Sequence, residues 1–158
     1  MDTDLALLLS QASYVLATEL TLALAVIGIT PRLFSVLRAA LDADRTQSQV
    51  AAQCALDKTT MVVTMDALER AGLAERKPSP HDRRARIIAV TPAGAELVAK
   101  AEQVIGGIYK DVLASLPGSE RAAFVAGLTR LAQGRLSTPV PCEKPPRRRA
   151  ARVPQSVN

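Results

Sequence analysis

The sequence predicts a mainly α-helical fold that carries one small β-hairpin, and three observations support this prediction. The chain has 158 residues, of which 48% are hydrophobic but only 3% are aromatic. A core built from Ala, Leu, Val and Ile favours packed helices over a β-sandwich. Most segments carry apolar residues at helical spacing, and two short apolar runs that flank a polar, Pro-rich turn predict the hairpin.

The first element is an apolar helix over residues 4–27, which Gly28 ends. Thr30 then caps a second helix that begins at Pro31, because Pro is favoured at the first helical position. The first helix is about as long as a membrane span, but Glu19 near its centre would cost a few kcal/mol in lipid. The acidic start of the chain also disfavours a signal peptide. We therefore expect no membrane association and a helix buried nearly all round, which implies a partner surface.

Two short helices joined by a tight turn come next. Thr46 and Gln49 have the spacing of a capping box, which opens a helix that extends to about Cys54. Asp57 can cap the following helix, which is about three turns long and ends before Gly72. This pair of helices has the pattern of a helix-turn-helix.

The hairpin and two further helices complete the order of elements. Its strands are expected over residues 73–77 and 85–90, with a long loop that should project. Another helix begins after Thr91, and a last helix runs from Pro117 to about Leu136. The composition then shifts to Pro and Arg without periodicity, which predicts disorder.

The net charge of +5 is unevenly distributed. Residues 1–44 hold two basic and five acidic side chains, whereas residues 45–91 hold eight basic and five acidic ones. This local basic excess indicates a surface that faces a polyanion. Because aromatic residues are scarce, binding to single-stranded nucleic acid, which stacks bases on aromatic side chains, is disfavoured.

The sequence resembles the MarR family of bacterial transcriptional regulators over about residues 30–135. Three phrases carry the likeness: TQSQVAA (Thr46 to Ala52), LDKTTMVVTMDALERAGL (Leu56 to Leu73) and AERKPSPHDRRARIIAVTPAG (Ala74 to Gly94). The most specific is the last, which joins an Asp-Arg-Arg turn, a hydrophobic strand and Thr-Pro-x-Gly. The resemblance implies a winged helix-turn-helix and a homodimer whose first and last two helices interlock.

The resemblance also implies how the chain divides. We expect a dimerisation helix in residues 1–30, a winged helix-turn-helix lobe in 31–91, dimerisation helices in 92–136 and a basic tail in 137–158. The tail arginines Arg147, Arg148 and Arg149 would add nonspecific phosphate affinity or be inert.

The second short helix is the expected recognition helix, whose first turn enters the major groove. That turn offers Lys58, Thr59 and Thr60 to base edges or phosphates. In the alternative interpretation, the two threonines only satisfy helix-start donors. Val62 and Val63 stand where the family often carries an arginine, and exposed valines would suit thymine methyl groups. The alternative is that one valine packs internally.

Two further groups of residues are expected to contact DNA. Gln47 and Ser48, at the start of the preceding helix, suit phosphate contacts that position the protein without reading sequence. The loop between the strands, the wing, carries Arg83 and Arg84, with Arg86 just inside, and these suit a narrow A·T minor groove. Asp82 is expected to ion-pair with a neighbouring arginine. Alternatively, this charge cluster only stabilises the turn.

A small-molecule site is the other property that the resemblance implies. Family members commonly bind aromatic acids or small amphiphiles between the dimer helices and the DNA-binding lobe. In this chain that junction would lie near Tyr14, Phe34 and Leu37, which could equally be plain core. Arg32 and Arg38 are the basic candidates to hold an acid.

Other chemistries find little support in the sequence. Cys54 and Cys142 do not form a disulfide framework, so we expect reduced thiols, with redox sensing at Cys54 as the alternative. A single His and no cysteine pair at ligand spacing disfavour a metal site. No Gly-rich phosphate loop and no nucleophile–base set is recognisable, so we expect neither an enzyme nor a cofactor.

These observations predict a cytoplasmic, nucleoid-associated bacterial protein that binds double-stranded DNA as a homodimer. The expected site is a palindromic operator, rich in A·T pairs, and the expected role is that of a ligand-responsive repressor. One alternative is an activator or architectural protein without a ligand. Another is a winged-helix module whose exposed valines contact a protein.

Overall fold

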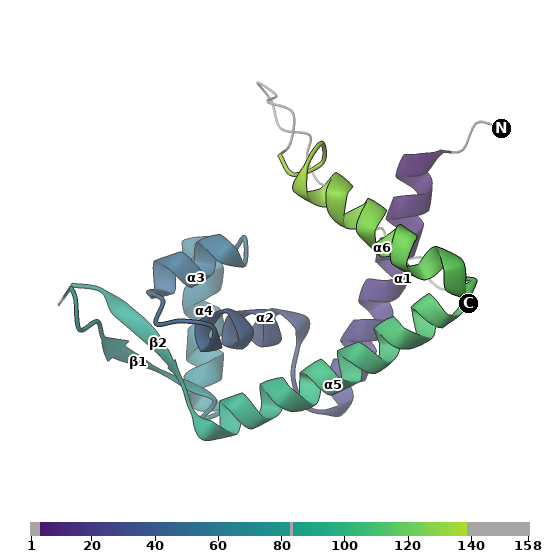
Figure 1. The fold of residues 1–158 in the computed structure, drawn as a ribbon. Coiled ribbons are helices and arrows are strands. Elements are labelled where there is room, and N and C mark those ends of the chain that lie inside the picture. Colours follow the sequence, from purple (N-terminus) through teal and green to yellow (C-terminus); the bar gives the residue numbers. More distant parts are fainter. Residues whose placement is uncertain (1–3, 83, 139–158) are drawn as a thin grey trace, which may run out of the picture. The chain divides into compact units, whose positions relative to one another are not determined.

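The computed structural model describes residues 4–82 and 84–138, and Figure 1 shows its fold. Arg83, Cys142 and the tail arginines lie outside the described residues. The elements are α1 (Leu5–Val26), α2 (Pro31–Leu41), α3 (Gln47–Gln53), α4 (Lys58–Arg70), β1 (Ala74–Pro78), β2 (Arg86–Val90), α5 (Pro92–Ala114) and α6 (Gly118–Gln133). This order confirms the predicted mainly α-helical fold with one hairpin.

The last helix is shorter than predicted. It ends at Gln133 and not at about Leu136, because the chain turns at Gly134 and the N–H of Leu136 bonds back to the carbonyl of Leu131. Leu136, which the sequence analysis placed at the end of the helix, therefore belongs to the turn that follows α6.

Local signals in the sequence start and stop the helices of the helix-turn-helix. The capping box is present: the N–H of Gln49 donates to Thr46 Oγ1 at 3.2 Å, and the N–H of Thr46 donates to Gln49 Oε1 at 2.8 Å. Asp57 caps α4 by accepting the backbone N–H of Thr60. Gly72 ends the region with φ of 69°, a left-handed conformation that glycine adopts without strain.

The turn between α3 and α4 contains a feature that the sequence does not announce. Ala55 has φ of 51°, in the left-handed region that side-chain-bearing residues seldom occupy. The N–H of the next residue, Leu56, donates to the carbonyl of Ala51 at 2.8 Å. The tight turn that sets the angle between α3 and α4 thus holds Ala55 in a strained conformation.

The core of this part of the chain forms where α2, α3, α4 and the hairpin meet. The largest fully buried side chains are Leu24, Ile29, Val36, Leu37, Val50, Met61, Met65 and Leu68. The two strands pair antiparallel, from Ala74 opposite Val90 to Pro78 opposite Arg86. A bridge between Thr46 and Ile87 also ties β2 to the start of α3. The part of β2 next to the wing loop is therefore fixed to the start of the helix-turn-helix.

The Thr-Pro-x-Gly phrase fixes the start of α5 to the lobe. Thr91 donates its backbone N–H to the carbonyl of Leu73 at 3.0 Å and its hydroxyl to the carbonyl of Gly72 at 2.7 Å. The same hydroxyl accepts the N–H of Gly94 at 3.1 Å. Gly94 lies so close to the backbone of Leu73 that an added Cβ would be 2.1 Å from the carbonyl oxygen of Leu73. These contacts explain why the Thr-Pro-x-Gly sequence needs a threonine at its first position and a glycine at its last.

The described residues divide into two units, one that ends at Leu113 and one that begins at Ala114. In the second unit, α6 has no buried residue, and its exposed apolar side chains include Phe124, Val125, Leu128 and Leu131. In the first unit, α1 buries only Leu24. The expectation that α1 is buried nearly all round is therefore not met within a single chain.

By length and composition alone, α1 could also cross a membrane, and it is the one such helix in the described part of the chain. Its exposed apolar side chains are Leu5, Leu7, Leu8, Tyr14, Val15, Leu22 and Val26. An exposed apolar surface of this kind marks a site of interaction.

Candidate nucleic-acid interface

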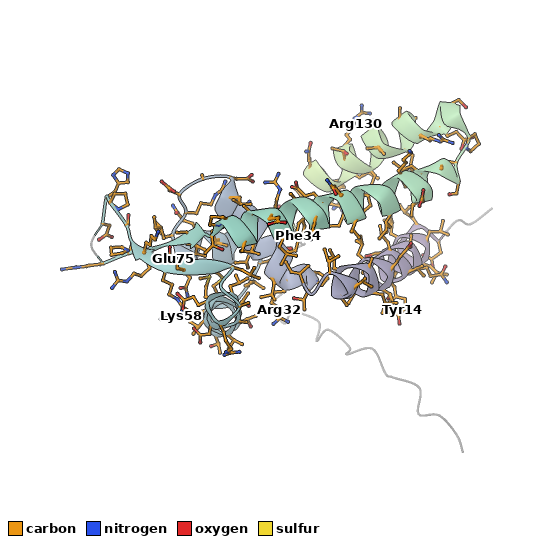
Figure 2. All side chains as sticks on the ribbon, turned by 90° about the horizontal axis from the view of Figure 1, so that it is seen from below. Tyr14, Arg32, Phe34, Lys58, Glu75 and Arg130 are labelled. Atoms are coloured by element: carbon orange, nitrogen blue, oxygen red, sulfur yellow. The ribbon has the colours of Figure 1, made fainter. Side chains whose placement is uncertain are left out.

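The start of α4 presents two side chains to solvent. Lys58 is the first residue of α4, which Figure 2 shows nearly end-on, and both Lys58 and Thr59 are exposed. Thr60 is half-buried, and its hydroxyl donates to Asp57 Oδ2 at 2.6 Å. This bond, with the N–H of Thr60, holds the pKa of the Asp57 carboxyl below its usual range. Thr60 therefore serves the helix start, whereas Lys58 and Thr59 are available to a ligand.

The two valines of α4 both face solvent. Val62 is 39% exposed and Val63 is 59% exposed, so the alternative that one of them packs internally is wrong. The buried face of the helix carries Met61, Met65 and Thr64, whose hydroxyl donates to the carbonyl of Thr60. Helix α4 thus presents two exposed valines to solvent next to its polar first turn.

An open hollow of about 680 Å³ lies between α3, the start of α4 and the wing loop. We call it the basic hollow. Its polar wall includes Gln47, Ser48, Lys58, Arg84 and Arg86. These residues come from three separate segments, and all were predicted from the sequence to contact DNA. The fold therefore gathers the predicted phosphate contacts and the described wing arginines around one concave surface.

The wing loop is held by its own polar side chains. Asp82 accepts the backbone N–H of Arg84 at 2.8 Å. The expected ion pair between Asp82 and a neighbouring arginine stays a prediction, because Arg83 lies outside the described residues. Ser79 Oγ accepts the N–H of His81 at 3.2 Å. Arg84 and Arg86 are exposed and form no ion pair in the described chain, so their charges are available to an anion.

Arg76 bonds to Gln47 at the candidate interface, and the sequence reasoning gave it no specific role. It was counted only as one of the bases of residues 45–91, but its guanidinium lies against α3 and α4, where it pairs with Asp66 and Glu69. A signal was present, because Arg76 is two residues from the buried Ala74 and therefore lies on the same, inward-facing side of β1. The two acidic residues also stand three apart on one face of α4.

The three predicted ligand residues do not converge on one site. Tyr14 is exposed on α1 and is set apart from Phe34 in Figure 2, while Leu37 is fully buried in the core. Phe34 borders a smaller hollow of about 400 Å³ whose wall includes Arg38 and Cys54. Leu37 is thus plain core, the alternative that the sequence left open.

Arg32 and Arg38, the two basic residues that could hold an acidic ligand, differ in whether their charge is already paired. Arg38 bonds to Asp42 and also pairs with Glu102, which raises the pKa of its guanidinium. Arg32 is exposed and has no ion pair among the residues that the structure describes. Of the two, Arg32 is the one free to bind an acid.

Cys54 is partly buried at the end of α3, and its thiol lies 3.5 Å from the carbonyl oxygen of Ser35. Burial raises the pKa of the Cys54 thiol, so the reactive thiolate is scarce at neutral pH. This geometry disfavours redox sensing at Cys54. Within the described ranges, no cluster of three or more metal-ligating side chains is present.

Comparison with known proteins identifies the family. The sequence model described as the MarR family matches residues 27–85. A protein of Thauera aromatica, described as a transcriptional regulatory protein for the hcr operon, is 33% identical over 113 residues, which span 71% of this chain and 68% of that protein. The chain belongs to the MarR family.

Solved structures of the transcriptional repressor CouR have a similar fold. CouR bound to a 23-mer DNA duplex is 30% identical, with a TM-score of 0.71, and the match covers 81% of this chain and 92% of CouR. CouR from Rhodococcus jostii RHA1 bound to p-coumaroyl-CoA is 28% identical, with a TM-score of 0.71, and the match covers 87% of this chain and 96% of CouR. The MarR-family chain is thus a DNA-binding transcriptional regulator with a winged helix, and not an enzyme.

Proposed function

We propose that this MarR-family regulator is a homodimeric, ligand-responsive repressor of the bacterial cytoplasm. It binds a palindromic operator through α3, α4 and the wing. The basic hollow carries this proposal, because it aligns Lys58, Arg84 and Arg86 with the start of α3 on one concave surface. A strand of phosphates that passes through the hollow brings α4 into the major groove and the wing into the adjacent minor groove.

Each part of this surface has its own role. Lys58 and Thr59 contact base edges or phosphates, while Gln47 and Ser48 donate to phosphates. The wing arginines, Arg84 with Arg83 and Arg86, enter a narrow A·T minor groove. Val62 and Val63 contact thymine methyl groups, because exposed apolar side chains on this face otherwise stay in water.

The test is selection of bound duplexes from a random-sequence pool by the wild-type chain and by two variants at Val63. Val63→Ser removes both methyl groups and is expected to abolish the thymine preference at one position in each half-site. Val63→Thr keeps one methyl group and is expected to retain the preference. An unchanged base preference in Val63→Ser would show that Val63 does not read the operator.

Binding should also depend strongly on salt, because phosphate contacts release counterions. A gel shift with the selected duplex at two salt concentrations measures this dependence. A chain that shows no specific, salt-sensitive binding would instead be a winged-helix module that binds a protein.

The dimer is proposed from the uncovered apolar surfaces of α1 and α6. A second copy of this chain covers both helices and places two recognition helices on a twofold-symmetric site. Leu22→Glu, which puts a charge on the exposed apolar surface of α1, is expected to give monomers in sedimentation and to abolish operator binding. Ala43→Glu, in the turn after α2, is the control and should remain a dimer. A Leu22→Glu chain that stays dimeric would contradict this interface.

The ligand response is proposed from CouR, which is bound to p-coumaroyl-CoA in a structure of similar fold. An aromatic acid or its thioester would be held by Arg32, and binding would change the spacing of the two recognition helices. We expect p-coumaroyl-CoA to release the wild-type chain from its selected duplex and Arg32→Gln to respond more weakly. Lys100→Gln, an exposed substitution on α5, is the control. No release at any concentration would exclude ligands of this type.

A further inference from the structure

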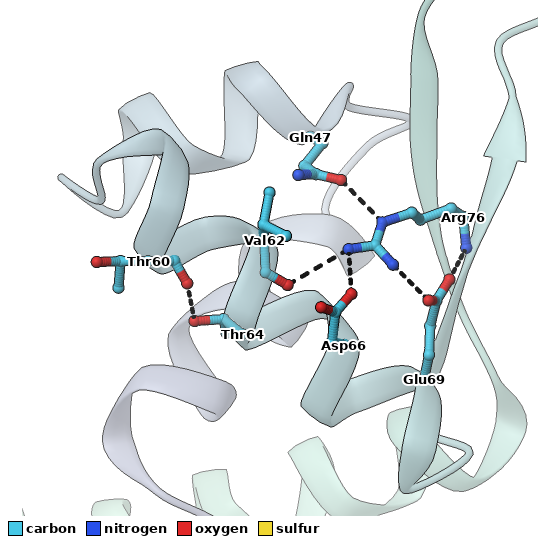
Figure 3. Close-up of polar contacts among 7 residues, drawn as sticks. All are labelled: Gln47, Thr60, Val62, Thr64, Asp66, Glu69 and Arg76. Atoms are coloured by element: carbon cyan, nitrogen blue, oxygen red, sulfur yellow. Dashed lines mark hydrogen bonds and ion pairs between the residues drawn. The ribbon is translucent and has the colours of Figure 1, made fainter.

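Arg76 connects three elements through one side chain (Figure 3). Its Nη2 donates to Asp66 Oδ1 at 2.8 Å and to the carbonyl oxygen of Val62 at 3.4 Å. Its Nη1 donates to a carboxylate oxygen of Glu69, and its backbone N–H donates to the other at 2.9 Å. Its Nε donates to Gln47 Oε1, at the start of α3, at 3.1 Å.

These bonds fix the orientation of α4 against the hairpin. They reach from Val62 to Glu69, about two turns of the helix. The side chain of Arg76 is 24% exposed, and a guanidinium is a rigid, planar fork of donors. The helix segment that carries Val62 and Val63 therefore has little freedom to turn while Arg76 is in place.

The charge of Arg76 is compensated inside the protein. Asp66 and Glu69 supply two carboxylates against one guanidinium, so this cluster is not positive. Arg84 and Arg86 differ, because they are exposed and unpaired among the described residues. Arg76 is thus poorly suited to neutralise a phosphate, although it lies beside the proposed DNA-binding surface.

Gln47 connects this cluster to the basic hollow. A guanidinium only donates, so the amide atom that faces Arg76 must be the oxygen. The two N–H groups of the amide are then directed away from Arg76, as Figure 3 shows. These N–H groups have no hydrogen-bond partner among the described residues, and Gln47 lines the basic hollow.

We propose that Arg76 is a positioning residue that orients the Gln47 amide so that its N–H groups donate to an operator phosphate. It holds α4 in the matching orientation and does not contact DNA itself. This inference rests on the proposed DNA-binding surface. It assigns the orientation of the phosphate contact to a residue of β1 that lies outside both helices of the helix-turn-helix.

Arg76→Lys separates positioning from charge, because lysine keeps the charge but cannot reach four separate acceptors with one ammonium group. Affinity for the duplex selected by the wild-type chain is expected to fall about tenfold, as for the loss of one charge-assisted hydrogen bond. The slope of log K against log salt should stay unchanged, whereas Arg84→Gln should reduce its magnitude by about 0.9 per chain. An Arg76→Lys chain that binds like the wild type would overturn the proposal.

The decisive readout is the coupling between Arg76 and Gln47. Gln47→Ala alone should weaken binding severalfold, but in the Arg76→Lys background it should have no further effect. A merely structural role of Arg76 would leave the full effect of Gln47→Ala in both backgrounds, and that result would overturn the proposal. Nuclear magnetic resonance of the free chain gives an independent check, since the Gln47 side-chain amide should be ordered in the wild type and mobile in Arg76→Lys.

Gln47→Glu keeps the test valid if Arg76→Lys does not fold. A glutamate still accepts a bond from Arg76 but has no donor for phosphate, so the chain should melt no lower than the wild type and bind more weakly than Gln47→Ala. Equal binding by Gln47→Glu and the wild type would overturn the proposal. Lys58→Ala and Arg84→Gln distinguish a failure of this inference from a failure of the proposed DNA-binding surface. If these two variants lose affinity while the Gln47 variants do not, only the inference about Arg76 and Gln47 fails. If none of these variants loses affinity, the proposed DNA-binding surface itself is wrong.

Discussion

Gly94→Ala perturbs the point at which α5 leaves the winged lobe. The added Cβ would be 2.1 Å from the carbonyl oxygen of Leu73 and 2.8 Å from Val90 Cγ1, so the backbone must move. That carbonyl also accepts the N–H of Thr91, and this bond would be strained. Overpacking costs about 1–3 kcal/mol and a lost hydrogen bond about 1 kcal/mol, while the gain in helix propensity is about 1 kcal/mol. We expect a net loss of about 1–3 kcal/mol.

Urea unfolding followed by circular dichroism measures this loss, at one chain concentration because a dimer unfolds in a concentration-dependent way. Gly106→Ala in the same helix is the matched control. Its added Cβ meets nothing within 4 Å, so it should stabilise the chain by about 0.5–1 kcal/mol. A Gly94→Ala chain as stable as the wild type would refute the close contact at this junction.

Three further substitutions or reactions test other parts of the structure. Ala55→Gly removes left-handed strain of about 1–2 kcal/mol but adds unfolded-state entropy worth roughly 0.5–1 kcal/mol. We therefore expect a gain of up to about 1.5 kcal/mol in the free energy of urea unfolding, and a clear loss would contradict the strained turn. Because the pKa of Asp57 is lowered in the fold, its contribution is complete above the unfolded value of about 3.9 and is lost as pH falls through the lower folded value. The wild type should lose more stability than Asp57→Asn on acidification from about pH 5 to pH 3, and equal losses would contradict this cap. Since burial raises the pKa of the Cys54 thiol, a Cys142→Ser chain should react with iodoacetamide at neutral pH more slowly than free cysteine, and equal rates would show an exposed, reactive thiol.

The elements that the sequence predicted best are those whose signals are local. Thr46 and Gln49 complete a capping box within four residues, and Gly72 takes the left-handed conformation for which it was identified. These interactions need only the neighbouring backbone, so spacing and residue type are sufficient. The start of every helix in the helix-turn-helix follows from such signals.

Features that depend on contacts between elements were not predictable in the same way. Arg76 looked like one more base of a basic segment, but its neighbours come from α3 and α4, and only the fold brings them together. Leu37 and Tyr14 were grouped as ligand residues, yet one is core and the other is exposed. The left-handed Ala55 has no sequence signal, because alanine seldom adopts this conformation.

Hydroxyl-radical footprinting on the selected duplex tests the central claim most directly, namely that two copies of the surface formed by α3, α4 and the wing bind a palindrome. We predict two protected patches related by twofold symmetry, with centres about 10 base pairs or a multiple of that distance apart. Lys58→Ala should weaken the protection of both patches together. A single patch without symmetry, or two patches that Lys58→Ala leaves unchanged, would contradict the claim.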